Sequence, residues 1–336
     1  YAVGIFALTA PESTVDLAAH PDITVETAHR IDLTDYIGLQ SAISPAAVRR
    51  FKSVRDEYRP EIVHVHNRFF FTSFLGLLYA PVSEYALVTS LHLGSLDQLE
   101  GTGGAAAELF QSTFSKRLVV HSDAVICVSE AVAGVAVALG VDPTRIHVAP
   151  HAVDFDRFSV ESTPFDKTLL YIGRFVANNG PQDLLQAVPE IVTAHPETTV
   201  HMVGQGTLEA QLTETVADLG IQEAVTMHGF VDDITALYAQ ADVFCRPSYS
   251  EGLPLTLLES MATDTVPVVT PVAGAGDIVT DGQTGRFVDV GAPETIAAAV
   301  AELFDDPDEL GAIAARAKAY VAANHSWQGR TRTIQG

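Results

Sequence analysis

Two glutamates, Glu251 and Glu259, are spaced to bind two different parts of one sugar-containing ligand. They lie in the stretch SYSEGLPLTLLESMA (residues 248–262), which follows a short apolar run typical of a buried parallel strand. Pro254 stands where the first turn of a helix over residues 255–261 should begin. Glu251 therefore lies in the turn. Glu259 lies about two turns inside the helix, where its carboxylate can accept hydrogen bonds from both vicinal hydroxyls of a ribose.

The same turn offers a site for phosphate. Gly252 has no side chain, so the backbone can approach a ligand closely there. The first N–H groups of the following helix have no helical partners and favour an anion. Leu253, Pro254 and Leu255 complete the loop. We therefore expect a phosphate-bearing ligand with a sugar on one side and a nucleoside on the other.

A second segment could hold a diphosphate. An apolar strand at residues 168–172 delivers Gly173 and Arg174 just before a helix expected to begin near residues 180–181. Arg174 can donate a forked pair of charge-assisted hydrogen bonds to phosphate oxygens, and the helix N–H groups add more. Two strands of the chain are thus each expected to end in an anion-binding turn.

The spacing of these residues and their order along the chain resemble a known enzyme family. Glu251 and Glu259, with seven residues between them and Gly-Leu-Pro inside, closely resemble the donor signature of the retaining GT-B glycosyltransferases of family 4. The segment 86–92, which ends in His92, resembles the T-x-H segment of that family. Residues 121–130 match its A-D-x-V-I-x-V-S-E segment closely. The resemblance covers almost the whole chain.

This resemblance implies a fold and a reaction. The implied fold is α/β of the GT-B type, in which two doubly wound Rossmann-like domains face each other across a cleft. The implied reaction transfers a hexosyl group from a nucleotide diphosphate sugar to an acceptor hydroxyl, on a glycan or a lipid-linked acceptor, with retention at the anomeric carbon. No cofactor other than this donor substrate is expected. No metal is expected either, because Arg174 and helix N–H groups would stabilise the leaving group.

The resemblance also implies roles for single residues. Glu251 would hold hydroxyls of the transferred sugar, with His92 on the far side of that sugar and Glu259 on the ribose. The backbone around Val231 would receive the nucleotide base, and the amides of Gly252 and the next residue would line the sugar. The residues expected to be catalytic are Arg174, Glu251 and His92, and those expected to bind the donor are Gly173, Asn179, Arg246, Gly252, Leu253, Pro254, Leu255, Glu259 and Val231.

Two positions depart from the family pattern. Relatives carry a lysine five residues after the arginine of the diphosphate site, and this sequence carries Asn179 there. They commonly carry an apolar residue where Arg246 precedes Pro-Ser in the donor loop. Arg246 could reach the diphosphate in place of the missing lysine, or it could be a solvated arginine at the end of a strand. The diphosphate site is therefore either completed by Arg246 or weakened.

Composition narrows the partners and the compartment. The 336 residues, 47% of them apolar, suit two domains. A net charge of −23, with lysine only at positions 52, 116, 167 and 318, argues against nucleic acid and allows at most peripheral contact with a membrane. The same balance resembles that of proteins from salt-in halophiles. Cys127 and Cys245 lie in apolar runs expected in different domains, which fits a reducing cytoplasm. The sequence shows no signal peptide and no apolar run of membrane-spanning length.

Two patterns that could bind a metal have plainer explanations. His64 and His66 share one face of a strand, but two ligands without a third rarely hold a metal. Asp154 and Asp156 match a D-x-D pattern, yet they fall in the expected linker turn between domains. We therefore expect no metal-ligating residues.

The chain is expected to divide into three parts. These are an acceptor-side domain (1–160), a donor domain (161–323) that closes with a long helix over 296–323, and the start of a C-terminal crossover segment (324–336). The family's first strand, glycine-rich loop and first helix are missing, so the chain is expected to be truncated at both ends.

Three other hypotheses stay open. These are an inactive nucleotide-sugar-binding protein, a GT-B sugar-nucleotide epimerase, and an active enzyme of which this sequence is a piece. A nicotinamide dehydrogenase is disfavoured because no G-x-G-x-x-G opens a strand-turn-helix.

Overall fold

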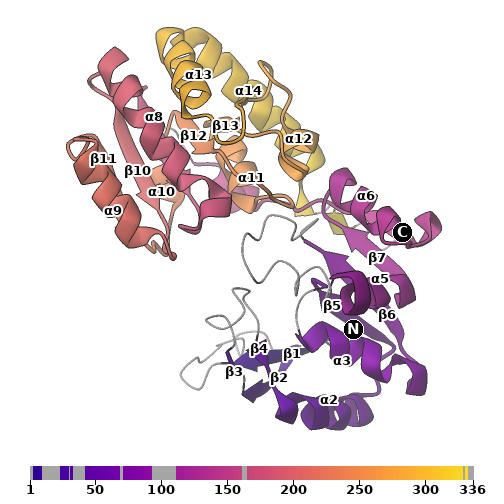
Figure 1. Cartoon of the computed structure of the whole chain (residues 1–336). Helices are drawn as coiled ribbons and strands as arrows, with labels where there is room; N and C mark the ends of the chain where they lie inside the picture. Colours follow the sequence, from indigo (N-terminus) through magenta and orange to yellow (C-terminus); the bar gives the residue numbers. More distant parts are fainter. Residues whose placement is uncertain are drawn as a thin grey trace. The chain divides into compact units, whose positions relative to one another are not determined.

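The computed structural model divides the chain into two compact α/β units, each described here by itself (Figure 1). The first holds residues 1–128 and 132–148, and the second holds residues 129–131 and 149–336. The residues that the structure describes are 3–9, 23–29, 31–32, 42–68, 71–92, 111–160, 165–327 and 330–331. The predicted crossover segment at 324–336 lies partly outside them.

Parallel strands dominate the first unit. Its main sheet has the order β5-β6-β7-β8, and β1 and β2 form a separate parallel pair. The short strands β3 and β4 pair antiparallel. The strands are β1 (Val3–Thr9), β2 (Ile23–His29), β3 (Ile31–Asp32), β4 (Ala42–Ile43), β5 (Ile62–His66), β6 (Ala86–Leu91), β7 (Ala124–Cys127) and β8 (Ile146–Val148).

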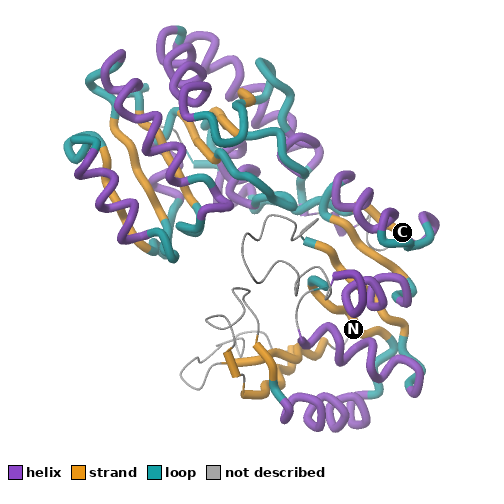
Figure 2. The backbone as a smooth tube through the Cα atoms, in the orientation of Figure 1, coloured by secondary structure: helices purple, strands orange, loops and turns teal. Residues whose placement is uncertain are grey.

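Helices connect these strands, as parallel pairing requires (Figure 2). Helix α2 begins at Pro45 because Ser44 precedes it and accepts a hydrogen bond from the Ala47 amide at 3.1 Å. Its Phe51 packs with Leu75 in a small apolar cluster. The helical segments before residue 149 are α2 (Pro45–Tyr58), α3 (Phe71–Tyr79), η1 (Ala80–Val82), η2 (Gln111–Ser115), α5 (Lys116–His121), α6 (Glu130–Ala138) and η3 (Pro143–Arg145).

The second unit contains a six-stranded parallel sheet of order β11-β10-β9-β12-β13-β14. Counted from β9, this is the order 3-2-1-4-5-6 of a doubly wound nucleotide-binding domain, and the order reverses between β9 and β12. Ligands of such sheets bind outside the carboxyl ends of the strands at this reversal. The strands are β9 (Thr168–Ile172), β10 (Thr199–Val203), β11 (Val225–Gly229), β12 (Val243–Arg246), β13 (Val266–Val269) and β14 (Arg286–Phe287).

Helices pack on both faces of this sheet. Helices α8, α9 and α13 and the start of α14 share one buried cluster with alternate strand residues such as Val243 and Cys245. Phe244 and Arg246 therefore point to the opposite face, because side chains alternate along a strand. The helical segments from Ala149 on are α7 (Phe155–Phe158), η4 (Ala177–Asn179), α8 (Pro181–Ala194), α9 (Glu209–Asp218), α10 (Thr235–Gln240), α11 (Leu255–Ala262), α12 (Gly274–Ile278), α13 (Pro293–Asp305) and α14 (Pro307–Asn324).

Two local predictions are changed or explained by capping. The prediction of a single helix over 296–323 is wrong, because the helix is interrupted at Asp306, between α13 and α14. The Asp306 side chain accepts a hydrogen bond from the Glu309 amide at 3.0 Å, and Pro307 starts the new helix. Asp154 of the D-x-D pattern has a similar task, since it caps the start of α7. Among the described residues, no helix combines the length and the apolar character that a bilayer crossing demands.

Candidate functional site

The two predicted anion-binding turns lie side by side at the carboxyl edge of the second sheet. One follows β9 and the other follows β12, and these strands pair directly through Leu169 with Val243 and Leu170 with Phe244. This is the point at which the strand order reverses. The structure therefore brings Gly173 together with the donor loop at the place where such sheets bind ligands.

Close backbone packing shapes the turn after β9. A Cβ atom on Gly173 would lie 2.2 Å from Nη1 of Arg246, so only glycine fits there. Gly204, in the loop after β10, has φ +148°, and a Cβ on it would lie 1.9 Å from the Gly173 carbonyl oxygen. The Gly173 amide donates to the Val203 carbonyl at 3.0 Å. The position of the Gly173 turn thus depends on the absence of side chains at both glycines.

Arg174 is displayed from this turn with its side chain exposed. Its carbonyl oxygen accepts hydrogen bonds from Nδ2 of Asn179 at 3.0 Å and from the hydroxyl of Tyr171 at 3.3 Å. Within the described parts of the chain, its guanidinium forms no hydrogen bond or ion pair. The backbone of Arg174 is therefore fixed, while its charge is available to an anion.

Asn179 turns inward, where relatives carry a lysine. The residue is 3% exposed, and its amide group supports the backbone of Arg174. The next residue, Gly180, has φ +68° and precedes α8. A Cβ on Gly180 would lie 2.1 Å from the carbonyl oxygen of Pro247, so the turn after β9 packs directly on the donor loop. Asn179 thus shapes the site and adds no positive charge to it.

Further hydrogen bonds join the two turns. The Tyr249 amide donates to the Asn178 carbonyl at 2.8 Å, and Nδ2 of Asn178 donates to the Ser250 carbonyl at 2.7 Å. The Tyr249 hydroxyl also bonds Asp183, in the first turn of α8. Burial raises the pKa of the Asp183 carboxyl. None of these four residues was predicted from the sequence, because each acts through a partner distant along the chain.

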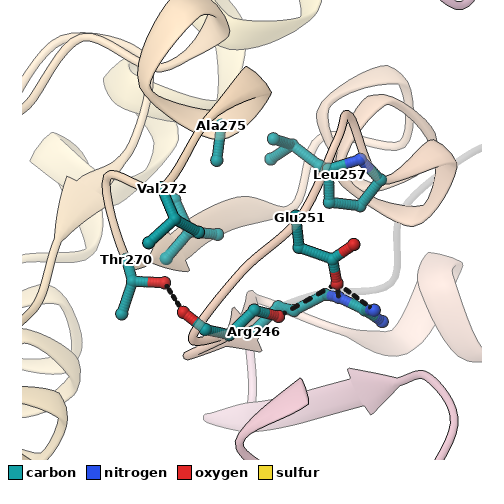
Figure 3. A pocket seen from close by; sticks show the side chains of 9 residues that line it. Arg246, Glu251, Leu257, Thr270, Val272 and Ala275 are labelled. Carbon is teal, nitrogen blue, oxygen red and sulfur yellow. Dashed lines mark hydrogen bonds and ion pairs between the residues drawn. The ribbon is translucent and has the colours of Figure 1, made fainter. Parts of the chain in front are cut away.

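The donor loop encloses a small pocket in which Glu251 lies between Arg246 and Leu257 (Figure 3). Oε1 of Glu251 accepts hydrogen bonds from Nε of Arg246 at 3.0 Å, from its Nη2, and from Oγ of Ser248 at 3.1 Å. Nη1 of Arg246 donates to the Ile172 carbonyl at 2.6 Å. The guanidinium that we expected at the diphosphate thus contacts Glu251 and the end of β9. The pocket is lined by Arg246, Ser248, Glu251, Pro254, Leu257, Val269, Thr270, Val272 and Ala275.

The rest of the donor loop presents backbone. Gly252 and Leu253 are buried, and the Gly252 carbonyl accepts a hydrogen bond from the Gly274 amide at 2.7 Å. Pro254 precedes α11, and Leu255, its first residue, is exposed. Among the described residues, the amides of Gly252 and Leu253 donate no hydrogen bond. They are therefore able to donate to a ligand.

Glu259 lies on α11, as predicted, and is half-buried. It is the fifth residue of that helix and so lies little more than one turn from its start, not about two turns as expected. Its Oε2 lies 3.0 Å from the hydroxyl of Tyr238, a fully buried residue of α10. That hydroxyl is also 3.1 Å from the Thr256 carbonyl. Burial raises the pKa of the Glu259 carboxyl, and the Tyr238 hydroxyl opposes this shift. Tyr238 is a site residue that the sequence analysis missed.

The two remaining predicted residues, Val231 and His92, do not line this pocket. Val231 follows β11, two strands beyond β9, and the Gly229 carbonyl accepts a bond from the Gly204 amide at 2.8 Å. His92 belongs to the first unit, where its Nε2 lies 3.1 Å from Nδ1 of His66. Nε2 of His64 lies 2.8 Å from Oγ of Ser90. His64, His66 and His92 therefore have partners among themselves and in β6.

Solved structures with the same fold are glycosyltransferases of the GT-B type. The sucrose-phosphate synthase of Thermosynechococcus elongatus matches with a TM-score of 0.84 and 18% identity, over 99% of this chain and 87% of that one. HepE of Anabaena, solved in complex with UDP and glucose, matches with a TM-score of 0.73 and 19% identity, over 94% of this chain and 85% of that one. These likenesses confirm the predicted fold of two Rossmann-like domains.

The chain belongs to the glycosyl transferases group 1 family, whose model matches residues 153–320. The model named Glycosyltransferase Family 4 matches residues 2–157.

Among curated proteins, the glycogen synthase of Mycobacterium tuberculosis is 26% identical over 81% of this chain and 66% of its own length. The D-inositol 3-phosphate glycosyltransferase of Rhodococcus jostii is 30% identical over 56% of this chain and 46% of its own length. The chain thus spans less than two thirds of these two relatives.

Proposed function

We propose that this protein is a retaining, metal-independent hexosyltransferase that uses a nucleotide diphosphate sugar as donor. The observation that carries the proposal is the Arg174 guanidinium beside the Gly173 turn, at the reversal point of the sheet, which is exposed and has no partner among the described residues. A cation at that point suits the charge of a departing diphosphate. The complexes of HepE with UDP and with UDP-glucose lend support by analogy.

Each site residue has a task in this proposal. Arg174 takes the charge that develops on the leaving group. Glu251 accepts hydrogen bonds from sugar hydroxyls, and the Gly252 and Leu253 amides line the sugar. Glu259 accepts from the ribose and the backbone at Val231 receives the base. The acceptor is a glycan or a lipid-linked hydroxyl, and the reaction takes place in the cytoplasm.

A second candidate function is binding of a nucleotide sugar without transfer. The inward position of Asn179 favours it, because the lysine of relatives is absent and its replacement carries no charge. Release of nucleoside diphosphate from UDP-glucose or GDP-mannose, measured with glycan and lipid-linked acceptors, separates the two functions. If the protein binds the nucleotide sugar but releases no nucleoside diphosphate with any of the acceptors, the second function is favoured.

The Glu259→Ala variant is expected to bind UDP and UDP-glucose more weakly by about 2 to 3 kcal/mol each, the scale of a hydrogen bond to a charged group. The lost contact is to the ribose, so both ligands should lose the same amount. Tyr238 keeps the Thr256 carbonyl as a partner, so the fold should persist. Isothermal titration calorimetry measures both affinities, with Glu214→Ala, an exposed helical glutamate of the same unit, as the control.

The same contact gives an expected pH dependence. Burial raises the pKa of Glu259, so its carboxylate takes up a proton at higher pH than an ordinary glutamate. UDP affinity should therefore fall as the pH drops through that raised pKa, and Glu259→Ala should lack this fall. Loss of UDP-glucose affinity with unchanged UDP affinity would assign Glu259 to the sugar instead.

The protein is proposed to be adapted to concentrated salt. Its net charge of −23 produces self-repulsion at low ionic strength, and molar salt shortens the Debye length to roughly 3 Å. The melting temperature, followed by circular dichroism from low to molar KCl, is expected to rise. A flat or falling melting temperature over that range would rule out this adaptation.

A further inference from the structure

Arg246 and Glu251 form a buried ion pair next to the proposed sugar position. Their side chains are 9% and 14% exposed. Two nitrogens of the guanidinium donate to Oε1 of Glu251, and Oγ of Ser248 donates to the same oxygen. The other carboxylate oxygen, Oε2, points away from Arg246 (Figure 3). One oxygen of Glu251 thus accepts three hydrogen bonds from the protein, while the second accepts none from the residues that the structure describes and is left for another partner.

The guanidinium itself is fixed on all sides. Nη1 donates to the Ile172 carbonyl at 2.6 Å, and the missing side chain of Gly173 makes the room that this nitrogen fills. Each of the three guanidinium nitrogens therefore contacts either β9 or Glu251. The Arg246 side chain, held in this way, fixes the orientation of the Glu251 carboxylate. Arg246 belongs to β12, so this support comes from a strand and not from a loop.

Glu251 is the carboxylate that Arg246 contacts. A buried arginine needs a carboxylate close by, and Glu251 supplies it here. The other titratable groups facing the pair are Tyr171 of β9, Tyr238 of α10 and Cys245 of β12. Burial raises the pKa of each, so they stay neutral near pH 7 and do not compete for the guanidinium.

We infer that Arg246 is a positioning residue that holds Glu251 in one rotamer, with Oε2 directed at a hydroxyl of the transferred sugar. The inference rests on the proposed function and deepens it. It gives Arg246 a task different from diphosphate binding, because each of its three guanidinium nitrogens already donates to Glu251 or to the Ile172 carbonyl. Arg246 would therefore act on the sugar part of the donor through Glu251, without touching the ligand itself.

The test compares UDP with UDP-glucose, and GDP with GDP-mannose, in calorimetric titrations. The sugar increment is the Kd of the diphosphate divided by the Kd of the corresponding sugar donor. In Arg246→Met this increment is expected to fall about tenfold or more, as for a lost hydrogen bond to a charged group.

Further variants separate positioning from a structural role. Arg246→Lys keeps the charge without the fork, so it should restore only part of the increment. Glu251→Gln should abolish the increment, and adding Arg246→Met to it should cause little further loss. These two variants carry the test if Arg246→Met does not fold. Arg286→Met is the matched control, because Arg286 pairs with Glu302 at the surface of the same sheet.

Two outcomes would overturn the inference alone. Equal weakening of diphosphate and sugar donor in Arg246→Met would place Arg246 on the diphosphate. An unchanged sugar increment in a folded Arg246→Met variant would make Arg246 a structural residue. Failure of the unaltered protein to bind any of the four probes would contradict the proposed function, and the inference with it.

Discussion

Replacing Arg174 by alanine is expected to lower the rate of sugar transfer by about 10²- to 10³-fold, the usual effect of removing one donor aimed at developing charge. The charge on the diphosphate grows as the bond to the sugar breaks, so kcat should fall more than donor affinity. The fold should be unaffected, because the side chain is exposed and the carbonyl that binds Asn179 and Tyr171 remains. Steady-state release of nucleoside diphosphate measures both quantities.

Arg316→Ala is the control for this loss of a positive charge. Arg316 is also an exposed arginine of the second unit, but it pairs with Glu309 on α14. It should leave kcat unchanged and shift stability only slightly, as surface ion pairs contribute little. A kcat of the Arg174→Ala enzyme close to that of the unaltered protein would show that the leaving group is stabilised elsewhere.

The substitution Gly204→Ala is expected to destabilise the second unit by about 3 kcal/mol or more. A φ of +148° is open only to glycine and costs about 1 to 3 kcal/mol for other residues. The added Cβ would also meet the Gly173 carbonyl oxygen at 1.9 Å, and backbone on both sides has to move. Because Gly173 carries Arg174, donor affinity should fall together with the melting temperature.

Comparison with Gly220→Ala separates the two causes of the loss in Gly204→Ala, which are the backbone strain of a positive φ and the collision of the new Cβ. Gly220 also has a positive φ, +68°, but a Cβ there would meet no atom within 4 Å. It should cost only about 1 to 2 kcal/mol, the penalty of a left-handed residue, and leave donor affinity intact. Equal melting temperatures for the two variants would show that the loops after β9 and β10 separate without cost.

The sequence predicted the parts of the site that depend on local pattern. Apolar runs marked β9 and β12, and a proline marked the start of two helices, as the first residue of α8 and as the residue before α11. Glycine marked the turn at Gly173, where the Arg246 guanidinium fills the space that a Cβ would need. These signals lie within a few residues of the element that they specify, so a single chain without its fold reveals them.

Contacts between distant residues were not predictable in this way. The role given to Arg246 assumed a ligand, whereas its guanidinium reaches Glu251 and Ile172 across the sheet. Asn179 has the same character, since only the folded turn shows its side chain inside. The break at Asp306 was locally encoded by Asp-Pro, but continuous alanine-rich periodicity on both sides favoured one helix. Pattern thus located the elements, and packing decided what their polar side chains bind.

Because Cys245 is buried, the rate at which its thiol is labelled measures how often β12 opens. Its thiol is fully buried in the strand that also carries Arg246, and burial raises its pKa, so a thiol reagent reacts only after the strand opens. The labelling rate then equals the opening equilibrium multiplied by the rate for a free thiolate, as in hydrogen exchange. Nucleotides that bind only the closed domain slow this reaction by mass action. Modification of the native Cys245 thiol by such a reagent can therefore report ligand occupancy without an engineered label.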